Sequence, residues 1–250
     1  MTGSVALEFR KMRRLRAIPL LIGLVGAAAA LSSASLFSGG ARATFDDPDA
    51  SPWPTLLLSY TMIVALTSPI VAAVLASRQT DIEHSGSGWN LAATSGRSRS
   101  SLCRAKLCAL ALLLAPAVTC QTLLVIGIGL LVGITAPLDP LPWLVYTGLV
   151  LLLDITFCAL HIWLAARLEN QLVSVGVGMI GAFLAAFSLL SPASVSRVIP
   201  WGYYAVISQA GQSGDAVVYL QAPYDWIVGF LILAAAAFSV GLHRLDRIGG

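Results

Sequence analysis

Asp154 and His161 are two ionisable side chains within an otherwise apolar stretch, where they could carry proton chemistry. Their spacing of seven residues places both on roughly the same face of a helix. Burying one carboxylate at the centre of a bilayer costs about 2.5 to 3.5 kcal/mol. One interpretation is a proton relay or a polar patch for a substrate. The other is an interhelical hydrogen bond from Asp154 to Gln121, Thr119 or Ser174, which the sequence favours because the carboxylate lacks a charged partner.

The remaining motifs argue against catalysis by this chain. Gly176-Val-Gly-Met-Ile-Gly181 matches the dinucleotide-binding fingerprint, but that motif needs a strand that turns into a helix beside solvent, and here it lies in an apolar stretch. Ser174, Gly178 and Ala182 recur every four residues, which indicates close helix packing instead. The sequence has no phosphate-binding loop, no His-Glu-x-x-His helix and no serine elbow, and its cysteines lack metal-ligand spacing. We expect no catalytic residue, no metal site and no cofactor bound by this chain.

The composition indicates that lipid is the main solvent. Of 250 residues, 57% are hydrophobic and 11% are charged, and the mean hydropathy is +0.83, whereas charged residues make up about 25% of a soluble domain. Six stretches are long enough to cross a bilayer, which requires about 20 mostly apolar residues. These expected spans are residues 17–38, 54–77, 106–135, 141–166, 171–191 and 225–243. The predicted fold class is an all-α integral membrane protein, with residues 1–250 in one transmembrane domain.

The positive charges lie mostly on one side of the expected spans. Thirteen of the 15 Lys and Arg residues fall on the side of both termini if the spans alternate, which leaves Arg42 and Arg197 on the other. Cytoplasmic loops of membrane proteins carry an excess of Lys and Arg. The sequence therefore predicts a multi-pass protein of the cell membrane with both termini in the cytoplasm.

Two segments outside the expected spans, both on the cytoplasmic side, are expected to form short helices. In residues 1–16, Val5, Phe9 and Met12 share one helical face, which fits a helix lying on the inner membrane surface, although a basic flank is an alternative. Residues 78–105 are polar, and a short helix is expected at 89–94, bracketed by Gly88 and Gly96. This segment is either a solvated loop held near anionic lipid or a docking element for a cytoplasmic partner.

The segment 192–224, between the last two spans, is unusually apolar for a loop. Short helical pieces that dip back into the outer leaflet would bury its apolar side chains, with Pro200 as the break. Trp201, Tyr203 and Tyr204 would then lie at headgroup depth. The alternative is an interfacial loop anchored by these aromatic residues.

The layout resembles a known family. It has a basic N-terminal surface helix, six spans, a cytoplasmic segment after the second span and a broken apolar segment before the last. This layout looks like that of the permease subunits of type 2 ABC transporters, which have the type V exporter fold. The detailed similarity lies in the cytoplasmic segment, in Glu83, Gly88, Trp89, Thr94, Arg99 and Lys106. The Pro200-Trp201 corner resembles the lantibiotic-immunity and drug-export branch.

This resemblance implies mechanical coupling rather than catalysis. Two permease copies, or a permease and a close homologue, would pair with two copies of a separate ATPase, which uses ATP and Mg²⁺, and would export a hydrophobic or amphipathic substrate such as an antimicrobial peptide, drug or lipid. Glu83 would be a hinge or docking carboxylate, and Trp89 a hydrophobic knob in the ATPase groove. Membrane lipid is the other expected partner, and no nucleic-acid partner is expected. A stand-alone secondary transporter that uses Asp154 and His161, or a membrane immunity or scaffold protein, is the alternative.

Overall fold

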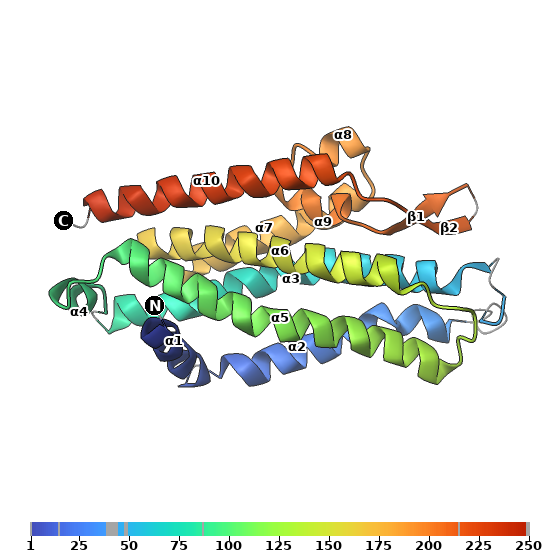
Figure 1. Cartoon of the computed structure of the whole chain (residues 1–250), viewed down its shortest axis with the longest axis horizontal. Helices are drawn as coiled ribbons and strands as arrows, with labels where there is room; N and C mark the ends of the chain where they lie inside the picture. Colours follow the sequence, from blue (N-terminus) through green and yellow to red (C-terminus); the bar gives the residue numbers. More distant parts are fainter. Residues whose placement is uncertain are drawn as a thin grey trace.

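The computed structural model describes residues 2–14, 16–38, 45–47, 50–86, 88–214 and 216–248, and these form an elongated bundle of helices (Figure 1). In chain order the elements are α1 Thr2–Arg14, α2 Ala17–Ser32, η1 Ala34–Phe37, α3 Pro52–Ser85, α4 Gly88–Thr94, α5 Arg99–Val132, α6 Pro140–Arg167, α7 Gln171–Leu189, α8 Ala193–Ser196, η4 Pro200–Gly202, α9 Tyr203–Val206, β1 Ala210–Ser213, β2 Ala216–Tyr219 and α10 Tyr224–Ile248.

Five helices in the described residues are long and apolar enough to cross a membrane, namely α3, α5, α6, α7 and α10. The first expected span is shorter than these, since α2 has 16 residues. It joins α1 through Arg16, whose φ of 53° is left-handed, and the two helices are bent by 68°. The structure therefore supports five membrane-spanning helices, or six if α1 and α2 are counted together.

The long helices begin and end at recognisable signals. Asp139 and Asn170 precede α6 and α7, and the side-chain oxygen of each accepts a hydrogen bond from the backbone N–H two residues on, at 3.0 Å in both cases. Gly133, with a φ of 110°, ends α5 in a left-handed cap. These short, sharply defined connections make neighbouring helices antiparallel, so that α4 and both termini lie at one end of the bundle and the β1–β2 hairpin at the other (Figure 1).

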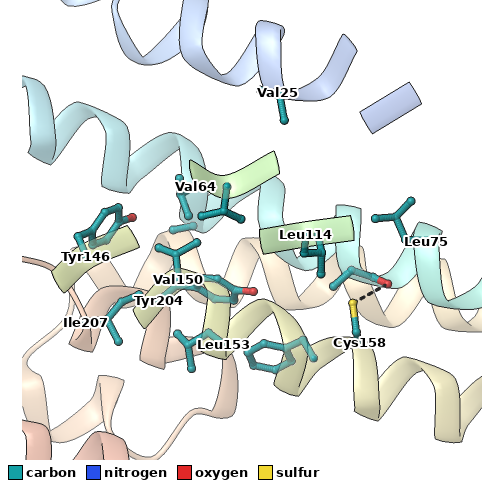
Figure 2. Close-up of a cluster of buried hydrophobic side chains, with 14 of the residues drawn as sticks. Val25, Val64, Leu75, Leu114, Tyr146, Val150, Leu153, Cys158, Tyr204 and Ile207 are labelled. Atoms are coloured by element: carbon teal, nitrogen blue, oxygen red, sulfur yellow. Dashed lines mark hydrogen bonds between the residues drawn. The ribbon is translucent and has the colours of Figure 1, made fainter. Parts of the chain in front are cut away.

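The core is built around α3, which packs against α2, α5, α6 and α7. At its first turns, Trp53 and Tyr60 contact Trp143 of α6, with ring centroids 6.2 Å and 6.3 Å apart. Figure 2 shows the next layer, where Val150 and Leu153 of α6 lie beside Tyr204 and the neighbouring Ile207. The segment 192–224 is thus part of the bundle core.

The segment 192–224 corrects the all-α expectation. It contains short helical pieces, α8, η4 and α9, with Pro200 at the first position of η4. An antiparallel hairpin follows, in which Ala210 pairs with Tyr219 and Ser213 with Ala216. The depth of this segment in the membrane stays a prediction.

Candidate coupling site at one end of the bundle

A cluster of buried charged side chains joins three helices near the N-terminus. Lys106 of α5 donates hydrogen bonds to Glu8 of α1 at 2.9 Å, to the backbone oxygen of Gln79 at 2.8 Å and to Glu83 of α3 at 2.8 Å. Lys11 of α1 bridges the same two carboxylates, at 2.9 Å from Glu8 and 2.5 Å from Glu83. The amide of Gln79 also donates to Glu8 at 3.2 Å. We call these five residues the charge cluster.

The local sequence explains why these side chains meet. Glu8 and Lys11 are three residues apart and so share one face of α1, while Gln79 and Glu83 are four apart on α3. Lys106 lies two turns into α5. Each helix thus presents its polar groups on the face turned toward the others.

The charge cluster is neutral overall and well hydrogen-bonded. The side chains of Lys106 and Glu8 are both 0% exposed, and that of Glu83 is 4% exposed. Two carboxylates and two ammonium groups balance one another, which is the condition under which buried charges are tolerated. Removing one partner would leave an uncompensated buried charge.

The same contacts set the ionisation of the cluster. Burial acts to raise the pKa of Glu83, but the charges and hydrogen bonds of Lys106 and Lys11 outweigh it, and the pKa is lowered. Burial acts to lower the pKa of Lys11, but its hydrogen bonds to Glu83 and Glu8 outweigh that effect, and the pKa is raised. Both shifts favour the charged, paired forms.

The short helix expected after Glu83 is present as α4, and it sits directly against the charge cluster. A Cβ added at Gly88 would collide with the carboxylate of Glu83, so the helix can begin this close to α3 only with glycine there. Trp89 packs edge-on against His84 of α3, with centroids 5.7 Å apart, and the guanidinium of Arg99 lies 5.7 Å from its ring centroid. These contacts fix α4 between α3 and α5.

Trp89 is not the protruding knob that the sequence suggested. It is 8% exposed, whereas Leu91 on the same helix is 72% exposed. The reason is the ring's packing against His84 and Arg99. Thr94 is exposed and its hydroxyl donates to the backbone oxygen of Leu91 at 3.0 Å, outside the charge cluster.

Glu83 is also buried rather than a solvated loop charge. Of its two expected roles, docking carboxylate or hinge, burial fits the hinge, because a buried carboxylate is not available to a partner's surface. Glu83 and Lys106 are brought together, while Gly88, Trp89 and Arg99 form the adjoining α4 contacts.

Further contacts tie the remaining helices to this end of the bundle. His84 lies 2.8 Å from the backbone oxygen of Ala165 in α6. Asp246 of α10 accepts a hydrogen bond from the backbone N–H of Ser100, in the first turn of α5, at 2.9 Å. α4 therefore contacts α3 and α5, and these two helices are in turn bonded to α6 and α10.

Sequence reasoning missed Glu8, Lys11, Gln79 and Asp246. The useful signal was Glu8, the one acidic residue in the first 45 positions, placed beside the apolar stripe of α1. A lone carboxylate that is buried beside the apolar face of a basic helix needs a partner. Its partners on α3 and α5 lie about 70 and 98 residues away, at Gln79 and Lys106, so spacing alone does not identify them.

Asp154 and His161 form hydrogen bonds with different partners. Asp154 accepts a hydrogen bond from the hydroxyl of Tyr204 at 2.7 Å and another from Ser68 of α3. His161 Nδ1 lies 3.0 Å from the hydroxyl of Ser174 in α7. The interhelical hydrogen bond expected of Asp154 is present, but its partners are Tyr204 and Ser68 rather than Gln121, Thr119 or Ser174. A role of Asp154 in transport stays a prediction.

The aromatic residues of the segment 192–224 pack inward. Trp201 and Tyr204 stack on Phe157 of α6 at 5.6 Å and 5.4 Å, and Tyr203 stacks on Phe230 of α10 at 4.0 Å. Tyr204 is fully buried. Phe157 and Asp154 thus hold Tyr204 within the bundle, and its depth in the membrane stays a prediction.

Gly178 of the apparent dinucleotide fingerprint serves helix packing, and Gly181 lies against the ring of Trp201. Gly178 of α7 faces Ala73 and the backbone oxygen of Pro69 in α3, and a Cβ there would collide with Ala73. This confirms the packing interpretation. In the described part of the chain, no three His, Cys, Asp or Glu side chains are grouped as metal ligands.

A protein-family comparison decides the identity. Residues 4–185, which run from the first turn of α1 through most of α7 and include the whole charge cluster, match the family model described as ABC-2 family transporter protein. The chain belongs to the ABC-2 transporter family. Comparison with curated proteins finds no match. The chain is thus a multi-pass membrane permease, and members of this family are non-catalytic and work with a separate ATPase subunit. Its sequence has no phosphate-binding loop, which agrees with ATP hydrolysis by a separate subunit.

Proposed function

We propose that this permease exports a hydrophobic or amphipathic substrate, and that α4 with the charge cluster transmits the movement of its ATPase to the membrane helices. The observation that carries the proposal is the direct bonding of α1, α3 and α5 through Glu8, Glu83 and Lys106, beside the short helix α4. A cluster whose four charged side chains are all paired transmits displacement better than a loose loop, because these side chains cannot separate without leaving an unpaired buried charge.

Each residue has a distinct role in this proposal. Leu91, exposed on α4, is the apolar contact for the ATPase, with Thr94 and the backbone around it. Trp89 and Arg99 hold α4 in place, and Gly88 allows it to lie against Glu83. Glu83 and Lys106 act as the hinge through which α4 moves α3 and α5 together with α1, which is bonded to the same two side chains.

The assembly would contain two permease copies, or the permease with a close homologue, and two ATPase subunits. The excess of Lys and Arg at the α4 end of the bundle supports a cytoplasmic location for this end and for both termini. The type V exporter fold and the lantibiotic-immunity or drug-export branch are part of the same proposal, and rest on the resemblance at 83–106 and Pro200-Trp201. A hydrophobic or amphipathic substrate, such as an antimicrobial peptide, drug or lipid, is compatible with membrane helices that carry few charged side chains.

The secondary-transporter alternative has little support. It needs a titratable pair along one path, but Asp154 and His161 are engaged with separate partners, Tyr204 and Ser174.

The proposal is tested by purifying the tagged permease from its native membrane in mild detergent and identifying co-purifying proteins by mass spectrometry. Recovery of a phosphate-loop ATPase in near-equal amount, with ATP hydrolysis by the complex, supports it. Recovery of the permease alone in several detergents contradicts it.

A further inference from the structure

A groove runs along the side of the bundle between α6, α10 and the segment 192–224. It consists of two adjoining pockets that share Pro200 and Phe230. The deep pocket has a volume of about 390 Å³ and the mouth about 470 Å³. Figure 1 shows the first turns of α10 beside α8 and α9, at the end of the bundle opposite α4. We call the two pockets together the side groove.

The lining of the deep pocket is mostly apolar and aromatic. Phe157, Leu160, Trp163 and Phe238 line it together with alanines of α10. The hydroxyl of Thr156 in the lining donates to the backbone oxygen of Leu152 at 2.8 Å, and the indole N–H groups of Trp163 and Trp201 are buried. A ligand in this pocket therefore meets apolar and aromatic surface, which suits an acyl chain.

The mouth carries one charge of each sign. Arg197 and Asp225 both line it, and neither forms a salt bridge within the described residues. The guanidinium of Arg197 lies 5.0 Å from the ring centroid of Trp226, which holds it in place. Its Nε is buried without a hydrogen-bond partner in the part of the chain that the structure describes. Arg197 as a whole is half-buried and lines the mouth, so a ligand phosphate there would supply the guanidinium with an opposite charge.

The distribution of charge selects the ligand. We propose that the side groove binds one phospholipid with a phosphoethanolamine headgroup, whose phosphate contacts Arg197, whose ammonium contacts Asp225 and whose acyl chain fills the deep pocket. Guanidinium groups bind phosphate oxygens through charge-assisted hydrogen bonds. A headgroup with a net negative charge would leave Asp225 opposed to it, and a trimethylammonium group has no N–H to donate to that carboxylate.

Native mass spectrometry of the delipidated full-length chain tests this directly. The probes are phosphatidylethanolamine, phosphatidylglycerol and phosphatidylcholine with identical acyl chains, added in equal amounts. We expect a one-lipid adduct dominated several-fold by phosphatidylethanolamine. Equal adducts from all three lipids, or a preference for phosphatidylglycerol, would overturn the proposed headgroup recognition.

Variants separate the two halves of the groove. Arg197→Gln should reduce adducts of phosphatidylethanolamine about tenfold, and Asp225→Asn should shift the preference toward phosphatidylglycerol. Ala234→Trp should fill the deep pocket and reduce binding of all three lipids, whereas Ala235→Trp, at the next and exposed position outside the lining, should not. Equal lipid binding by the two tryptophan variants would contradict the acyl-chain site. If Ala234→Trp does not fold, the lipid preference of the unmodified chain and of Asp225→Asn still decides the proposal.

Discussion

Lys106 of α5 lies 2.8 Å from Glu83 of α3, and both side chains are almost completely removed from solvent. Glu83 is the last acidic residue before α4, and Lys106 follows α4 by two helical turns of α5. The pair therefore closes the base of the loop that carries α4. Glu8 and Lys11 extend this contact to α1, so one neutral cluster joins α1, α3 and α5.

Neutralising Lys106 should destabilise the protein strongly. Lys106→Met leaves Glu8 and Glu83 with Lys11 alone, so one negative charge is buried without a partner, and breaking a buried pair in this way costs about 3–5 kcal/mol. Unfolding in mixed micelles followed by tryptophan fluorescence measures the loss.

The double variant Lys106→Met/Glu8→Gln restores neutrality, because the pair Glu83–Lys11 remains. We expect it to recover much of the stability that Lys106→Met loses. Arg104→Gln, at an exposed position of the same helix, is the control and should change stability by about 0.5 kcal/mol or less. A double variant no more stable than Lys106→Met would show that charge balance does not hold the cluster together.

Gly88→Ala should displace α4. The added methyl group would collide with the Glu83 carboxylate, so either α4 or the hinge side chain has to move. Coupled ATP hydrolysis by the complex should fall, while permease insertion in the membrane stays normal. Gly23→Ala in α2, where a Cβ meets nothing within 4 Å, is the matched control. Equal activity of the two variants would argue against close packing of α4 on Glu83 as a functional requirement.

Trp89 and Leu91 should separate stability from docking. Trp89→Ala removes a buried aromatic ring and should lower stability by about 3–5 kcal/mol. Leu91→Asp should leave stability within about 0.5 kcal/mol, because the side chain is exposed, and should weaken association with the ATPase. Thermal unfolding and quantitative co-purification measure the two effects, and an unchanged ATPase yield with Leu91→Asp would contradict the docking role.

Stability should be lost at both extremes of pH. The pKa of Glu83 is lowered from 4.5, so its contribution is present above that value and is lost as pH falls through its lower folded-state pKa. The pKa of Lys11 is raised from 10.5, so its contribution is present below that value and is lost as pH rises through its higher folded-state pKa. A pH series of unfolding midpoints should be flat between these limits. Glu83→Gln should weaken the fall of the unfolding midpoint at acidic pH. If the fall at acidic pH is the same in this variant, Glu83 is not the group that causes it.

Asp154 should act as a structural anchor. Tyr204→Phe removes the hydroxyl that donates to Asp154 and leaves a buried carboxyl oxygen without this partner, which costs about 1–3 kcal/mol. Transport should continue to depend on ATP and be insensitive to a protonophore. Transport driven by a proton gradient alone, and abolished by Asp154→Asn, would support the secondary-transporter alternative instead.

The parts of the fold set by local composition could be predicted from the sequence. The apolar runs predict the long helices, and the glycines at 88 and 96 bracket α4 at Gly88–Thr94. The hairpin was missed although Gly214, with a φ of 63°, and the run Ala216–Tyr219 are strand and turn signals, because the surrounding segment is apolar enough to be interpreted as helical. The charge cluster and the Asp154–Tyr204 bond depend on residues far apart in the sequence, so only the packed structure brings them together.

The most direct test of the central claim is site-specific photocrosslinking from α4 in the native membrane. A benzophenone amino acid replaces Leu91 in one variant and Leu131, exposed at the opposite end of α5, in another. We predict a crosslink from position 91 to a phosphate-loop ATPase and none from position 131. An ATPase that co-purifies with the permease but crosslinks from position 131 and not from position 91 would contradict the coupling role of α4.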